Sequence, residues 1–196
     1  MKPFIKRIEV KSHLLLLLPQ VGLMLYLKCT NDIQKTLGLR KEQITEAQIS
    51  EAPLGNWYIQ RFNVEGYTSY LFMSDRTFLS FILFEGRKKF SPEALPMMFL
   101  GGLQQLLQML EIPQATIDQA LSHYHVGLFS KTNSRSDLGV LNNLIQHYLW
   151  CIEDEGGVQQ CNLSPIIFSV NNIIQRRLNW QTSIEATKQE LGLKKP

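Results

Sequence analysis

T-N-S-R-S-D-L-G-V-L-N-N-L-I-Q-H-Y-L-W-C-I-E-D-E-G-G, residues 132–157, predicts one long amphipathic helix with both ends marked. Ser134 is a good N-cap, and Asp137 follows three residues later, as in a capping box. Gly156 and Gly157 can supply the left-handed stop. Large apolar residues recur at helical spacing on one face: Leu138, Leu141, Ile145, Tyr148, Leu149 and Ile152. This helix is therefore expected to organise the core.

Charges at the two ends of this helix run against its dipole. Arg135 stands in the first turn, where positive charge is disfavoured, so we expect a carboxylate partner elsewhere in the fold or a bound anion. Glu153, Asp154 and Glu155 crowd the last turn. Successive helical side chains point in different directions, so this acidic end is predicted to be a solvated terminus and not a site.

The remaining pattern predicts a single α+β domain. The chain has 196 residues, of which 44% are hydrophobic and 19% charged, which suits one domain with a real core. We expect a central antiparallel sheet with the helices packed mainly on one face. The expected strands are Met24–Cys29, Asn56–Val64, Tyr67–Met73, Thr77–Phe84 and His123–Ser130, and the two main helices are Ala94–Leu110 and Ser136–Asp154. Near the C-terminus, Leu163–Val170 is expected to be strand-like or irregular, and Asn171–Trp180 and Ser183–Leu191 to be helical.

Residues 1–23 are interpreted separately from the domain, which is placed at residues 24–196. Basic residues precede the apolar run Leu14–Leu18, as in a signal peptide, but Pro19 interrupts the run and no small-residue cleavage site follows. A domain-like pattern begins at Met24, so our hypothesis is that translation starts there and residues 1–23 are an upstream extension. A signal peptide and a native N-terminal segment are the alternatives.

Composition restricts the partners and the compartment. Three cysteines at unrelated spacings do not form a secreted disulfide framework, so reduced thiols in the cytoplasm are expected. The sequence contains no run of about 18 apolar residues, so no membrane span is predicted. A formal charge of +3 is too small to argue for nucleic acid by itself. No P-loop, G-x-G-x-x-G or G-x-S-x-G pattern occurs, so the sequence predicts no cofactor and no activated serine.

Three blocks carry a family resemblance: L-Y-L-K-C-T-N-D-I-Q-K-T-L-G-L at Leu25–Leu39, L-G-N-W-Y-I at Leu54–Ile59, and N-S-R-S-D-L-G-V-L-N-N-L at Asn133–Leu144. In that order the chain resembles an uncharacterised bacterial family classed as a domain of unknown function. The resemblance implies a small cytoplasmic α+β domain of bacteria or mobile elements, with no established activity and no catalytic residues to carry over. The individual residues that match the blocks are Trp57, Arg135, Leu138, Gly139 and Asn142.

Histidines and one cysteine are the weak metal candidates. His123 and His125 would share one face of a strand, and His147 and Cys151 one face of a helix. Four such groups could bind zinc, but no C-x-x-C or H-E-x-x-H pattern supports it, so no metal is predicted. The candidates for binding a ligand or an anion are Arg135, Trp57, His123, His125 and Asn142.

Three classes of function stay open. A non-catalytic binding or regulatory module comes first, because no catalytic motif occurs. A hydrolase or nuclease with a site near Arg135 and His123 or His125 is second, and a structural partner in a complex, with itself or with another protein, is third. Weak support for nucleic acid comes from the basic groups Arg87–Lys89 and Arg176–Arg177 and from tyrosines that could stack on bases: Tyr58, Tyr67 and Tyr70.

Overall fold

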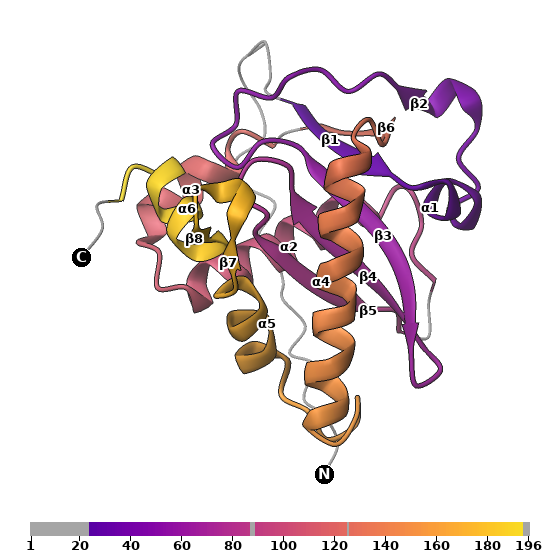
Figure 1. The fold of residues 1–196 in the computed structure, drawn as a ribbon. Coiled ribbons are helices and arrows are strands. Elements are labelled where there is room, and N and C mark those ends of the chain that lie inside the picture. Colours follow the sequence, from indigo (N-terminus) through magenta and orange to yellow (C-terminus); the bar gives the residue numbers. More distant parts are fainter. Residues whose placement is uncertain (1–23, 87–88, 125, 194–196) are drawn as a thin grey trace.

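The computed structural model describes residues 24–86, 89–124 and 126–193, so the 1–23 segment, Arg87, Lys88 and His125 lie outside the described residues. The fold is α+β, as expected, and Figure 1 shows helices in front of and behind one large sheet. The sheet strands are β1 (Met24–Cys29), β2 (Ile44–Thr45), β3 (Trp57–Val64), β4 (Tyr67–Ser74), β5 (Ser80–Phe84) and β6 (Val126–Lys131). The helices are α1 (Asn31–Thr36), α2 (Leu95–Met109), α3 (Gln114–Leu121), α4 (Arg135–Asp154), α5 (Leu163–Asn171) and α6 (Ser183–Glu190), with a 3-10 turn at Lys41–Gln43.

The large sheet is mixed, and the expectation of a purely antiparallel sheet was wrong. Its strand order is β2-β6-β1-β3-β4-β5. The meander β3-β4-β5 is antiparallel, as predicted, but β1 runs parallel to both β3 and β6. Parallel neighbours need long crossover connections, and the chain supplies them between β1 and β3 and through α2 and α3 before β6.

The main helices cover opposite faces of this sheet, which corrects the expectation that they share one. Neighbouring residues of a strand point to opposite faces, and Trp57 and Tyr58 belong to different core clusters. Trp57 packs with α2 through Phe99, whereas Tyr58 belongs to the cluster that contains Leu141 of α4. We call these the α2 face and the α4 face. In Figure 1, α4 crosses in front of the strands and α2 lies behind them.

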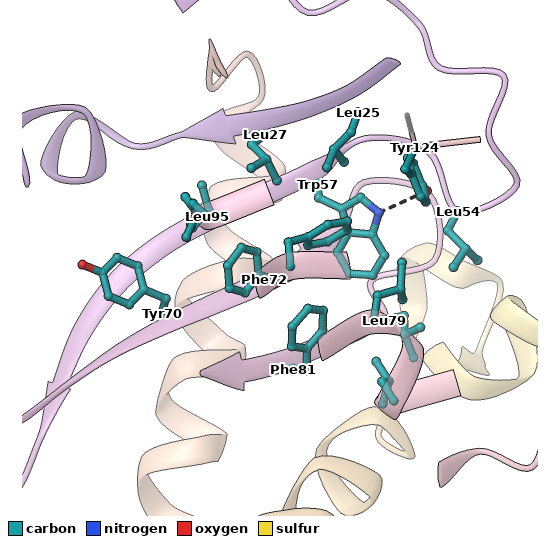
Figure 2. Packing of buried hydrophobic residues seen from close by; sticks show 14 of the residues in the cluster. Leu25, Leu27, Leu54, Trp57, Tyr70, Phe72, Leu79, Phe81, Leu95 and Tyr124 are labelled. Atoms are coloured by element: carbon teal, nitrogen blue, oxygen red, sulfur yellow. Dashed lines mark hydrogen bonds between the residues drawn. The ribbon is translucent and has the colours of Figure 1, made fainter. Parts of the chain in front are cut away.

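The α2 face holds an aromatic core (Figure 2). Phe72 and Phe81 stack at 5.0 Å between ring centroids, and Trp57 meets Phe99 edge to face, also at 5.0 Å. The Trp57 indole Nε1 donates to the Tyr124 hydroxyl at 3.2 Å, the dashed line of Figure 2. Burying large rings with their one polar atom paired is the favourable way to bury a tryptophan.

Helix α4 begins as its sequence predicts. The Ser134 hydroxyl accepts from the backbone N–H of Asp137 at 3.1 Å, which confirms the N-cap. The helix continues for 20 residues to Asp154. Gly156 and Gly157 then adopt positive φ angles of 86° and 95°, the left-handed conformation that ends the helix.

The segment after α4 differs from its predicted structure. The residues expected to be strand-like form helix α5, because Asn162 caps it and Pro165 falls in the first turn, where no backbone N–H is needed. The residues expected to form the next helix make a small hairpin of β7 (Ile174–Gln175), a 3-10 turn (Arg176–Leu178) and β8 (Gln181–Thr182). No helix within the described ranges is long and apolar enough to cross a membrane.

Candidate functional site

A polar pocket of about 140 Å³ opens at one end of the strands of the large sheet. The parallel strands β1 and β6 have their carboxyl ends there, which is where α/β sheets commonly bind ligands. The turn after β4 and the loop before β3 complete its wall. Its lining residues are Lys28, Ala47, Gln48, Ile49, Ser50, Gly55, Asn56, Asp75, Arg76 and Asn133.

Lys28 is the buried cation of this pocket. It is the fifth residue of the otherwise largely apolar strand β1, and only 5% of its surface is exposed. Its ammonium group lies 2.7 Å from Asp75 Oδ2 and 4.9 Å from the centre of the Tyr58 ring. A buried ammonium is tolerated only with such a countercharge. The remaining N–H groups of Lys28 make it a donor for an acceptor in the pocket.

Asn56 lines the same pocket and carries an unpaired acceptor. Its backbone N–H donates to Asp75 Oδ1 at 2.9 Å, and its side-chain Nδ2 donates to the Gln48 carbonyl at 2.8 Å. Its Oδ1 is buried and has no hydrogen-bond partner in the described part of the chain. An acceptor left unpaired in this way is costly unless a water or a ligand donates to it.

Gly55 allows the close approach that builds this wall. It has a φ of +68°, and a Cβ at this position would collide with the Asp75 carboxylate. Arg76 fastens the facing loop, because its guanidinium donates to the Ser50 carbonyl at 2.9 Å and the Pro53 carbonyl at 3.4 Å. The loop therefore holds a fixed rim, on which the Ile49 side chain is 97% exposed.

A hydrogen-bond chain connects the pocket to the start of α4. The Tyr58 hydroxyl lies 2.9 Å from Asn133 Oδ1 and 3.0 Å from Asp137 Oδ2. Asp137 Oδ1 in turn forms an ion pair with Arg177 at 2.6 Å. Burial, together with the Asp137 carboxylate, raises the pKa of Tyr58, so the phenol stays protonated and acts as a donor.

The sequence-predicted ligand residues are spread over the molecule. Trp57 lies in the aromatic core behind the pocket, where its partner Tyr124 donates to the Gly55 carbonyl at 2.9 Å. Asn142, on the surface of α4, accepts from Gln60 at 3.0 Å. His123 follows α3, and its buried Nδ1 has no partner among the described residues. Arg135 is exposed at the start of α4.

No carboxylate forms an ion pair with Arg135 within the described ranges. The basic residue that does reach the start of α4 is Arg177, through Asp137. Two tyrosines suggested for base stacking, Tyr58 and Tyr70, have no exposed surface, so their rings are not available for it. No ion pair or hydrogen bond joins Arg135 to His123 among the described residues.

The weak metal candidates are histidines and one cysteine, and the chain has three cysteines in all. No group of three His, Cys, Asp or Glu residues suited to a metal occurs within residues 24–86, 89–124 and 126–193. His147 and Cys151 sit on α4, and the ring of His147 contacts Trp150 at 5.4 Å. Burial is the main cause that raises the thiol pKa of Cys29, Cys151 and Cys161, the opposite of what an activated thiol needs.

Sequence reasoning missed the residues that form the pocket, Lys28, Asn56 and Asp75. One signal was present: a lysine inside the strand M-L-Y-L-K-C, whose other residues are apolar or aromatic. A charge at such a position is rarely buried without a partner, so it could have been singled out. Its partner lies 47 residues away and could not be identified from spacing.

Comparison with known families identifies the chain by its sequence. A family model described as "Domain of unknown function (DUF6933)" matches residues 26–186. The match spans most of the chain, including most of β1, the meander and all of α4. The chain therefore belongs to this family, which confirms the resemblance described above. No curated protein matches the chain.

Proposed function

We propose that this member of the family is a non-catalytic binding module, and that the pocket between Lys28, Asn56 and Asn133 is its binding site. The observation that carries the proposal is the pair of complementary groups in one small pocket. Lys28 offers N–H donors, and Asn56 Oδ1 is a buried acceptor that nothing described fills. A ligand that offers an acceptor beside a donor would satisfy both.

The chemistry of the lining favours binding over catalysis. Asp75 is engaged by the Lys28 ammonium and by the Asn56 backbone N–H, so it is not a free base. No nucleophile paired with a base lines the pocket. A primary amide or the edge of a nucleobase has the required acceptor and donor side by side, and the exposed Ile49 on the rim would cover an apolar part of such a ligand.

The test is a titration of ¹⁵N-labelled protein followed by NMR, with four small probes. Nicotinamide and uracil carry both an acceptor and a donor, acetate carries only acceptors, and methylammonium only donors. We expect the first two to shift the backbone amides of Asn56, Asp75 and their neighbours at millimolar concentration, and the last two to shift them much less. Equal shifts with acetate, or none with any probe, would contradict the proposal.

Variants locate the binding within the pocket. Asn56→Ala removes the unfilled acceptor and is expected to abolish the response to nicotinamide and uracil. Asn63→Ala is the matched control, because Asn63 is exposed at the far end of β3. If both variants bind the probes as the unmodified protein does, the ligand lies elsewhere.

A further inference from the structure

The exposed charges at the two ends of α4 are opposite in sign and run against the helix dipole, whereas Asp137 in the first turn is paired with Arg177. Arg135 is exposed at the first residue, and Glu153 and Asp154 are exposed in the last turn, which has no basic residue. Helix dipoles favour the reverse arrangement. Twenty residues span about 30 Å, so the two charged ends are too far apart to neutralise each other within one molecule.

Between these ends, the outer side of α4 carries a residue without a side chain and an exposed ring. Gly139 is exposed in the helix interior, and a Cβ built on it would meet no described atom within 4 Å. Glycine weakens a helix interior, and none of the described residues packs against Gly139 in a way that requires its small size. On the same side of the helix, about three turns further along, Trp150 is 60% exposed, with its ring edge-on against His147.

A single symmetry operation matches all of these features. A two-fold axis that passes beside α4, perpendicular to the helix and level with the midpoint between residues 144 and 145, would set a second α4 antiparallel to the first. Arg135 would then face Asp154 of the partner subunit, and Gly139 would face Trp150 of the partner subunit. Because such an interface is isologous, each contact would occur twice.

We propose that α4 pairs with α4 of a second copy of this chain in this antiparallel register. Each Trp150 ring lies over the flat surface at Gly139, and the basic start of each helix lies against the acidic end of the other. The exposed glycine and the charges set against the dipole are then explained together. The polar residues Asn143 and Gln146 meet near the axis, where both are exposed.

One helix pair makes a small interface. Interfaces below about 1,200 Å² in total are usually weak, so the dimer is expected to dissociate on dilution and to weaken with added salt. Sedimentation equilibrium of the full chain over a range of concentrations measures this directly. The weight-average mass should rise from 22.6 kDa toward twice that value as the concentration increases.

Two variants test the central contact. Gly139→Gln is expected to raise the dimer dissociation constant at least tenfold, while strengthening the isolated helix, so loss of folding cannot explain the result. Trp150→Ala is expected to weaken the dimer by a similar factor. Met97→Ala is the matched control, because Met97 is also 60% exposed but lies on α2, behind the sheet.

A charge exchange tests the register. Arg135→Glu alone places like charges together and should weaken the dimer, whereas Arg135→Glu combined with Asp154→Arg restores opposite charges and should recover it. A chain that stays monomeric at every concentration overturns the proposal. So does a dimer that tolerates Gly139→Gln, or one in which the single and double exchange variants associate equally.

Discussion

The two faces of the large sheet are stabilised in different ways. On the α2 face, aromatic rings of Trp57, Phe72, Phe81 and Phe99 fill the space between sheet and helix. On the α4 face, hydrogen-bonded polar groups lie among the apolar side chains: Lys28, Ser80 and Asn171 are buried there, and the Tyr58 and Tyr148 hydroxyls are paired.

The two faces therefore illustrate two kinds of stabilisation: packing of apolar side chains and pairing of buried polar groups. The aromatic side depends on shape and buried area, which tolerate conservative exchange of one apolar residue for another. The α4 side depends on particular pairs, and each buried polar atom that loses its partner is costly. The pocket and the proposed pairing helix both belong to the α4 side, where polar groups are already fixed in place.

Removing a ring from the α2 face is expected to have the largest effect. Phe99→Ala should lower the free energy of unfolding by about 4 kcal/mol, because Phe99 is fully buried and contacts three other rings and Tyr124. Urea denaturation measures it. Met98→Ala, at a neighbouring position that is 36% exposed, is the control and should cost far less. Equal losses would mean that the rings are not the main support of this face.

Breaking the buried ion pair should come next. Asp75→Asn keeps the acceptor for the Asn56 backbone N–H but leaves Lys28 without a countercharge, at a cost of about 3 kcal/mol. Urea denaturation of the variant at neutral pH measures this loss.

A double variant separates charge from packing. Adding Lys28→Met to Asp75→Asn removes the unpaired ammonium and should recover a good part of the lost stability. If the double variant is as unstable as the sum of both single variants, the pair does not act as a unit.

A smaller effect is expected from a single hydroxyl on the α4 face. The Tyr148 hydroxyl donates to the Ser80 carbonyl at 3.1 Å and lies 3.1 Å from the Ser80 hydroxyl. Tyr148→Phe keeps the ring and should cost about 1 kcal/mol, measured by the same urea titration. Phe81→Leu on the opposite face is the counterpart of this variant, because it changes packing and removes no hydrogen bond. A loss near zero for Tyr148→Phe would weaken the contrast between the faces.

The smallest change should follow from shortening the chain. The family match covers residues 26–186, so a chain that begins at Met24 should unfold within about 0.5 kcal/mol of the full-length protein. Mass spectrometry of the native N-terminus tests the related hypothesis that translation starts at Met24. An intact Met1 or Lys2 would contradict it.

Local chemistry explains which parts of the fold were predictable. The Ser134 cap and the tight turn at Glu65–Gly66 depend on neighbours in sequence, so the start of α4 and the β3-β4 hairpin were correctly placed. The direction of β1 against β3 and β6 depends on crossovers of many residues and was not. The hairpin after α5 was missed because Asn179 and Trp180 both take positive φ angles, 54° and 64°, which their residue types signal weakly.

The candidate site was less predictable than the fold. Arg135 and Asn142 drew attention because they lie in a recognisable helix, but that helix contributes to the pocket only through Asn133 just before it. The pocket depends on Lys28 and Asp75 meeting across the sheet, a contact that only the folded chain creates.

Asn171 has a consequence for how this protein can associate. Its side chain accepts from the Ser80 backbone N–H and donates to the Ser80 carbonyl, both at 2.7 Å, so it takes the place of a further strand beside the edge strand β5. The opposite edge, β2, is only two residues long. Within the described residues, Asn171 closes the Ser80 end of β5, and β2 is too short to offer a long row of backbone groups to another chain. Growth into strand-paired aggregates is thereby discouraged at both edges of the sheet. Association through the helical surface is then favoured over association through strands.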